Sequence, residues 1–179
     1  MRKFFVKKKG IIILAVILTM SLLLCGCSED EPAAEDNEVE VEAVENVPAI
    51  KGSQAYDIII SLEETGIPKA DAMETTDGFS FSSTTASYSY YIETNSKHEV
   101  MCAKFMVLDG NDDGYLGFCG SMPYDKADSN AQQWVNDNIG TDATETFGDA
   151  IYTLSVGDQG PILTIKAVGY DEYVMELIS

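Results

Sequence analysis

The sequence predicts an α+β domain in the C-terminal part of the chain: a two-layer structure in which an antiparallel sheet packs against two helices, in the order α-β-β-(β)-α-β-β. Three observations lead to this prediction. Apolar residues recur at helical spacing over 55–62 and 131–139. Aromatic and β-branched residues alternate with serines between 79 and 92. Turns rich in Gly and Asp separate the apolar runs that follow, as expected for antiparallel strands.

The first predicted helix covers the residues before Gly66. Its buried face is the set of apolar residues with i, i+3, i+4, i+7 spacing: Ala55, Ile58, Ile59 and Leu62. Ser53 carries a side chain that is favoured at a helix N-cap. Gly66 suits the left-handed residue that ends a helix, and Pro68 prevents the helix from continuing.

Strands are expected next. Alternation predicts that one set of side chains shares a buried face: Phe79, Phe81, Tyr88, Tyr90 and Ile92. Tyr91 then lies on the opposite, exposed face, where its ring is the better candidate for binding a sugar or peptide. Residues 100–108 form an apolar strand that we expect at the centre of the sheet. The loop 109–114 joins it to a shorter predicted strand at 115–119.

The remaining elements are a helix, a hairpin and a terminal segment. The helix is expected from about 129 to 139, where Gly140 ends it. Two strands, 150–156 and 162–168, are joined by a Gly-Asp-Gln-Gly turn. Residues 170–178 fit a short helix or an edge strand, and the spacing of their apolar residues slightly favours the helix.

The charge of the chain is sharply divided. Five of the eleven Lys and Arg residues lie within the first nine positions. From residue 28 onward, thirty Asp and Glu face six Lys, a formal net charge of −24. This balance excludes a nucleic-acid-binding protein and a polybasic membrane-binding module, because both need Lys and Arg to neutralise phosphate. One His and four Cys also exclude zinc fingers and multi-His metal sites.

The N-terminus has the layout of a secretory signal. A basic opening, residues 1–10, precedes an apolar run, residues 11–24. Fourteen helical residues extend about 21 Å, whereas the hydrocarbon core of a bilayer is about 30 Å thick. A removed signal therefore explains the run better than the alternative, a retained membrane-spanning helix.

The residues after this run are Leu24-Cys25-Gly26-Cys27. They resemble the lipobox of bacterial lipoproteins, with Cys25 a departure at position −2. The resemblance implies that Cys27 receives a diacylglyceryl group and that signal peptidase II removes residues 1–26. Cys25 fits this role less well, because Leu24 would then stand where a small residue is needed. The alternative is a pair of ordinary buried cysteines.

Two acyl chains anchor a protein stably to a bilayer, whereas one chain does so only marginally. The resemblance thus implies a lipid-anchored protein on the extracytoplasmic face of the cell membrane. Residues 27–53 would form an acidic, disordered tether, since nine of residues 28–46 are acidic and none is aromatic. A helix over 35–45 is the alternative. Residues 54–179 are expected to form a single globular domain.

The loop 109–114 fits the pattern D-x-[DN]-x-[DN]-G that opens a calcium loop. Calcium prefers oxygen ligands, and the predicted ligands are Asp109, Asn111, Asp113 and the carbonyl of Tyr115. Position twelve is Gly120 rather than the usual Glu, and the flanks are predicted to be strands. The alternative is a hairpin turn, because Asp, Asn and Gly bond their own backbone and tolerate left-handed conformations.

Cys102 and Cys119 are the two cysteines of the predicted domain. Export would place them where disulfides persist, and a hairpin register around the loop 109–114 could set them opposite one another. A disulfide between them is therefore one prediction. The alternative is a pair of buried free thiols that pack as small apolar side chains.

The catalytic signals are weak. No Cys-x-x-Cys or Gly-x-Ser-x-Gly motif occurs, and the single histidine, His98, lies beside a turn, where a surface position is expected. We therefore predict a non-enzymatic binding domain. The alternative is a small cell-envelope hydrolase with paired carboxylates. An aromatic concavity favours the binding domain, whereas a cleft with two acids about 5–10 Å apart favours the hydrolase.

Overall fold

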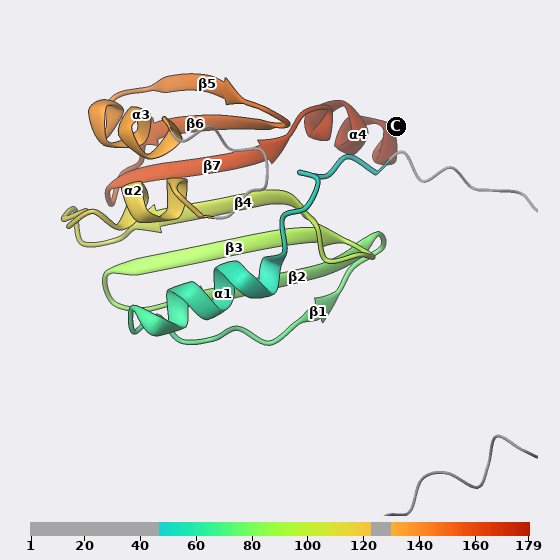
Figure 1. The fold of residues 1–179 in the computed structure, drawn as a ribbon, viewed down its shortest axis with the longest axis horizontal. Coiled ribbons are helices and arrows are strands. Elements are labelled where there is room, and N and C mark those ends of the chain that lie inside the picture. The colour runs from blue at the N-terminus through green and yellow to red at the C-terminus, as the bar shows by residue number, and fades with distance from the viewer. Residues whose placement is uncertain (1–46, 123–129) are drawn as a thin grey trace, which may run out of the picture. The chain divides into compact units, whose positions relative to one another are not determined.

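The computed structural model describes residues 47–122 and 130–179, which form an α+β fold with an open, seven-stranded antiparallel sheet. Figure 1 shows short helices packed against this sheet. The predicted fold class is confirmed. The predicted signal peptide, the lipidation residue Cys27 and most of the acidic tether lie outside the described residues.

The sheet has the spatial order β1-β2-β3-β4-β7-β6-β5, and each pair of neighbours is antiparallel. The strands are β1 (Met73–Glu74), β2 (Gly78–Thr84), β3 (Tyr88–Asn95), β4 (Val100–Val107), β5 (Ala143–Phe147), β6 (Ala150–Val156) and β7 (Pro161–Ala167). β4 occupies the centre, as predicted. The two edge strands, β1 and β5, were not predicted. Both are short, and both consist mainly of exposed residues that give no apolar signal.

The helices are α1 (Ala55–Glu64), α2 (Tyr115–Gly120), α3 (Ala131–Asn138) and α4 (Tyr170–Leu177). In Figure 1, α1 crosses β2 and β3, whereas α2 and α3 lie over the other half of the same face. α4 follows the end of β7, and the helical interpretation of this segment is confirmed. Its first turn contacts the sheet through an ion pair between Lys166 and Asp171 at 2.7 Å and a hydrogen bond from Tyr170 to Glu93 at 2.7 Å.

The face of the sheet under the helices forms the core, and its strand residues are almost completely buried: Phe81, Tyr90, Ile92, Ala103, Phe105, Tyr152, Leu154, Leu163 and Ile165. The opposite side, which we call the open face, carries mostly polar residues: Ser80, Ser82, Tyr91, Glu93, Cys102, Lys104, Met106, Thr153, Ile162, Thr164 and Lys166. The predicted alternation is confirmed at two neighbours, because Tyr90 is 1% exposed and Tyr91 is 37% exposed.

The first helix forms as predicted. Ala55, Ile58, Ile59 and Leu62 are completely buried. Gly66 has a φ of +92°, and the N–H of Ile67 bonds the carbonyl of Leu62 at 3.1 Å, as in a glycine-terminated helix. The N-cap prediction was wrong, since Gln54 occupies that position without a side-chain cap.

Ser53 instead joins the N-terminal segment to β4. Its hydroxyl donates to the carbonyl of Ile50 at 2.5 Å and accepts the N–H of Val100 at 2.9 Å. The N–H of Ile50 also donates to the carbonyl of Val100 at 2.8 Å, and both Ile50 and Ser53 are completely buried. The packed domain therefore includes residues that we had assigned to the tether, and it begins by Ile50 rather than at residue 54.

The predicted strand at 115–119 is a helix, α2, which corrects the sequence interpretation. α2 packs closely against α3 through two glycines. A Cβ atom on Gly117 would lie 2.1 Å from Oδ1 of Asn136, and one on Gly120 would lie 2.8 Å from Cγ2 of Val135. The predicted second helix is confirmed as α3, with Ala131 and Val135 buried.

Candidate functional site

The loop between β4 and α2 is held by its own aspartates. The carboxylate of Asp112 accepts the N–H of Gly114 at 3.1 Å and the N–H of Leu116 at 3.0 Å. Free N–H groups at the start of a helix need such acceptors, and a carboxylate there is further stabilised by the helix dipole. Asp112 thus explains why a helix, rather than a strand, begins at Tyr115.

The residues predicted to bind calcium lie in this loop, and their bonds are those of a turn. Asp109 Oδ1 accepts the N–H of Asn111 at 3.1 Å, and the side-chain amide of Asn111 donates to the carboxylate of Asp113. The Ser87 hydroxyl, and next the Asn111 N–H, hold the pKa of Asp109 below its ordinary value. Asp113 has a left-handed φ of +45°.

Within residues 47–122 and 130–179, no group of three or more His, Cys, Asp or Glu side chains is arranged to hold a metal ion. Tyr115, whose carbonyl was the fourth predicted ligand, lies in the first turn of α2. The loop joins a strand, β4, to a helix, α2, so it is not the loop of a β-hairpin. The calcium site stays a prediction.

A hollow of about 230 Å³, which we call the aromatic pocket, lies beside this loop. It is bounded by residues from the end of α1, the start of β3 and the start of α2: Thr65, Ile67, Tyr88, Asp113, Gly114, Tyr115 and Phe118. Three of these residues carry aromatic rings, and one carries a carboxylate. Sites for small ligands combine apolar walls with a few polar groups in this way.

The aromatic rings are fixed by packing and by one hydrogen bond. The centroids of the Tyr88 and Tyr115 rings are 4.4 Å apart, and Phe105 meets Tyr115 edge-on at 6.4 Å. The Tyr115 hydroxyl donates to the carbonyl of Ser89 at 3.1 Å. Burial is the main reason that the pKa of Tyr115 is raised. Tyr115 therefore forms a rigid base on which Tyr88 rests.

Burial and the carboxylates of the loop raise the pKa of the Tyr88 hydroxyl. Burial has the largest effect, and the carboxylates of Asp113, Asp109 and Asp112 follow in that order. Each carboxylate disfavours the negative phenolate. The rim of the aromatic pocket therefore has a negative potential at the position of the Tyr88 hydroxyl.

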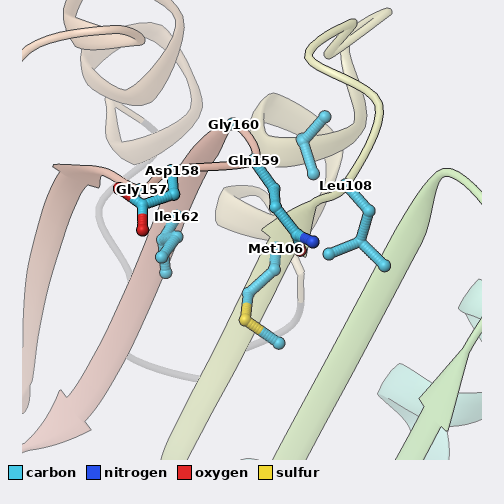
Figure 2. Close-up of a pocket in the computed structure, with 8 residues that line it drawn as sticks. Met106, Leu108, Gly157, Asp158, Gln159, Gly160 and Ile162 are labelled. Carbon is cyan, nitrogen blue, oxygen red and sulfur yellow. The ribbon is translucent and has the colours of Figure 1, made fainter.

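A second hollow, of about 290 Å³, lies between the end of β4 and the turn that joins β6 to β7; we call it the hairpin pocket (Figure 2). Its walls come from the end of β4 and the turn between β6 and β7: Met106, Val107, Leu108, Gly157, Asp158, Gln159, Gly160 and Ile162. A Cβ atom on Gly160 would lie 2.7 Å from the carbonyl oxygen of Val107, so glycine allows the turn to approach β4. Asp158 is the single carboxylate of this pocket.

The two cysteines do not face one another. Cys102 points to the open face, opposite Lys166 in the strand register, and its pKa is raised to about 11, mainly by burial. Cys119 lies in the core on α2, where burial raises its pKa well above the ordinary value. The hairpin register behind the predicted disulfide does not form, because residue 119 belongs to a helix. Both thiols are free in the structure.

His98 is half-buried rather than on the surface, which corrects the sequence interpretation. Its ring stacks on Phe79 with centroids 4.5 Å apart and lies 5.2 Å from the ring of Tyr56. It borders neither pocket. Among the described side chains, His98 Nδ1 is the one buried nitrogen or oxygen without a hydrogen-bond partner. The ring serves as packing at the turn between β3 and β4.

Sequence reasoning missed most of the aromatic pocket. Tyr88 was assigned to the buried face, which is correct, but its contact with a pocket was not foreseen. The sequence interpretation places Phe118 on a strand, and it assigns no binding role to Thr65 or Ile67. The signal that could have found Phe118 is the Asp112 cap, because a helix from residue 115 turns residues 115 and 118 to one side.

Comparisons of the chain with protein-family models, curated proteins and solved structures found no match. Across the part of the chain that the structure describes, no helix is long and apolar enough to cross a membrane.

Proposed function

We propose that this protein is a lipid-anchored, extracytoplasmic binding domain whose ligand site is the aromatic pocket. The observation that carries the proposal is the combination, in one hollow of about 230 Å³, of the rings of Tyr88, Tyr115 and Phe118 with a single carboxylate, Asp113. Aromatic rings provide a large contact area at a low cost in conformational entropy. A single fixed polar group can then orient the ligand.

Carboxylates are distributed in a way that favours binding over hydrolysis. Glycoside hydrolysis needs two carboxyl groups that flank the scissile bond, about 5–10 Å apart. The aromatic pocket has Asp113, and the hairpin pocket has Asp158, one carboxylate each. Asp109 and Asp112 accept backbone N–H groups of their own loop, and Asp113 accepts the side-chain amide of Asn111 while it also lines the aromatic pocket.

The aromatic pocket is also built in advance of any ligand. The N–H of Leu108 donates to the carbonyl of Ser87 at 2.7 Å, which ties the loop to the turn before β3. The N–H of Tyr115 donates to the carbonyl of Asp112 at 2.8 Å, and the N–H of Phe118 donates to the carbonyl of Gly114 at 2.9 Å. A prearranged site loses less entropy on binding than one that must be ordered.

The membrane anchor in this proposal rests on the lipobox-like residues 24–27 and the acidic segment that follows them. A segment with many carboxylates is repelled by an anionic bilayer surface, and this repulsion would hold the domain away from the membrane. We therefore propose the lipid bilayer as a partner of this protein, bound through the acyl chains on Cys27.

The anchor is tested by replacing each cysteine of the lipobox in turn. Cys27→Ala should leave an unprocessed precursor that incorporates no labelled fatty acid, because the thiol that carries the diacylglyceryl group is absent. Cys25→Ala is the matched control and should be processed and labelled normally. Full processing and labelling of Cys27→Ala would contradict the anchor.

The binding site is tested by ligand-observed NMR with a set of small sugars, amines, carboxylates and neutral aromatics. Phe118→Leu removes an aromatic face but keeps apolar volume, so we expect binding to weaken while the domain stays folded. Ile162→Ala, in the hairpin pocket, is the matched control and should bind as the unmodified protein does. Fragments that respond only to Ile162→Ala would move the site to the hairpin pocket and contradict the proposal.

A further inference from the structure

Building on the proposed binding function, we infer that the aromatic pocket recognises an organic cation, such as the ammonium or guanidinium group of a small ligand or of a partner's side chain. The inference rests on three features of the described residues: the charge at the pocket's rim, the aromatic walls, and the absence of a basic residue among those that line it.

The rim is acidic on the side of the loop. Asp113 lines the pocket, and Asp109 and Asp112 lie close enough to Tyr88 to act on its hydroxyl. Asp109 and Asp113 are exposed, so water and salt screen their attraction for a cation, but three carboxylates on one side of the pocket still favour a positive ligand and oppose a negative one. The chain from residue 28 onward has a formal net charge of −24, which adds long-range attraction for cations.

The walls of the aromatic pocket carry aromatic rings, which also attract a cationic ligand. A cation over an aromatic face is attracted by the ring's quadrupole when it lies within about 6 Å of the centroid. The Tyr88 and Tyr115 rings face one another with centroids 4.4 Å apart, and Tyr115 is only 7% exposed, so a cation would contact the outer face of Tyr88. Phe118 borders the same hollow. Aromatic walls with a carboxylate at the rim are the chemistry that binds alkylammonium groups.

The lining residues include no competing positive charge. The pocket is bounded by threonine, isoleucine, glycine, three aromatic residues and one aspartate. A carboxylate or phosphate ligand would therefore meet negative charge without a Lys or Arg to neutralise it. A neutral sugar would use the rings and donate hydroxyl hydrogen bonds to Asp113, but it would gain no net Coulomb attraction from that carboxylate, and this difference distinguishes the two kinds of ligand.

The test uses the full chain in a neutral maltoside detergent, at constant ionic strength balanced with sodium chloride. Tetramethylammonium is the probe, and tert-butanol is its neutral counterpart of similar shape. We expect tetramethylammonium to bind about two- to thirtyfold more tightly than tert-butanol, measured from aromatic chemical shifts.

Variants separate the local carboxylate from the general charge of the domain. Asp113→Asn keeps the side-chain shape, and Asn tolerates the left-handed φ of this position. It should weaken tetramethylammonium binding several-fold. Asp158→Asn, in the hairpin pocket, changes the net charge equally and should leave the affinity unchanged. Thermal unfolding of both variants verifies that they are folded.

Equal affinity for the two probes would overturn the inference, as would an equal response to Asp113→Asn and Asp158→Asn, since either result reflects non-specific attraction. If the neutral probe alone binds, and Phe118→Leu weakens it, the cation inference fails but the binding pocket stands. If neither these probes nor the fragments of the earlier screen respond to Phe118→Leu, the pocket fails as well.

Discussion

The two faces of the sheet share seven strands but differ in almost every other property. Under α1, α2 and α3, the strands present large apolar side chains such as Phe81, Tyr90 and Phe105, each at most 1% exposed. On the open face, the same strands present hydroxyl groups and two lysines, Lys104 and Lys166. Successive side chains along a strand therefore point alternately into the apolar core and to the polar open face.

This difference shows where the stability of the domain comes from. Burial of apolar area is the dominant favourable contribution to folding, so the face under the helices specifies the fold. Single residues of the open face can vary without a large cost. The aromatic pocket lies where the buried face reaches solvent, so its rings are anchored in the core and exposed at the loop.

The two faces should differ most in what a substitution at the centre of the sheet costs in free energy of unfolding. Phe105→Ala removes a completely buried ring and should lower the free energy of unfolding by about 3–5 kcal/mol. Thr164→Ala, on the neighbouring strand but on the open face, should change it by about 0.5 kcal/mol or less. Urea unfolding measures both. Similar losses in the two variants would contradict the contrast between the faces.

Substitutions of the two cysteines compare the stability contributed by the core and by the open face, and they also test the predicted disulfide. Cys119→Ser places a hydroxyl in the core and should cost about 1–3 kcal/mol. Cys102→Ser should cost less, because Cys102 is 8% exposed on the open face whereas Cys119 is completely buried. A disulfide would make the two losses nearly equal, since each variant would break the same bond. Mass spectrometry without reductant should find no two-dalton deficit.

We expect a smaller difference in stability between substitutions of Tyr90 and Tyr91, which are adjacent on β3 and point to opposite faces of the sheet. Tyr90→Phe removes a buried hydroxyl that accepts the N–H of Ala70 at 3.1 Å, so it should cost about 1 kcal/mol. Tyr91→Phe removes an exposed hydroxyl and should be nearly neutral. Thermal unfolding of the two variants gives the comparison. A larger loss for Tyr91→Phe would mean that the open face contributes more to stability than its exposure indicates.

The smallest effect concerns the exposed loop. The pKa of Asp109 is lowered in the folded protein, chiefly by the Ser87 hydroxyl, so its carboxylate stabilises the fold above the unfolded-state pKa of about 4. This contribution is lost as the pH falls through the lower folded-state value. Asp109→Asn should therefore be slightly less stable at pH 7, and the difference should vanish in acid. A difference that grows in acid would reverse the sign that we assign.

Sequence reasoning succeeded where several local signals agreed. The first helix had both a periodic apolar face and a Gly-Ile-Pro ending, and its four buried residues were all identified. The existence of β2, β3 and β4 followed from alternation and turns, and the apolar run of β4 indicated its central place. It failed at residues 115–119, because a run of five apolar and small residues has the same composition in a strand and in a helix.

The aromatic pocket could not be predicted, because its residues come from three segments that are far apart in the sequence. Tyr88 and Phe118 are brought together by the sheet register and by the start of α2, neither of which is encoded in a local motif. The hairpin pocket depends in the same way on the approach of the turn between β6 and β7 to the end of β4. The loop 109–114 could be identified from the sequence because its residues are contiguous. A contiguous run of Asp, Asn and Gly fits both a turn and a calcium-loop motif, so the sequence alone does not separate them.

The hydrogen bond from the N–H of Ile50 to the carbonyl of Val100 fixes the place where the described chain enters the domain, which is the beginning of β4. The aromatic pocket borders the loop after the other end of that strand. Eight strand residues separate these points by about 25 Å. For a domain tethered through Cys27, the chain would enter at one pole and the ligand at the other. A pull on the tether would then act first on the contact between Ile50 and Val100, at the end of β4 opposite the aromatic pocket.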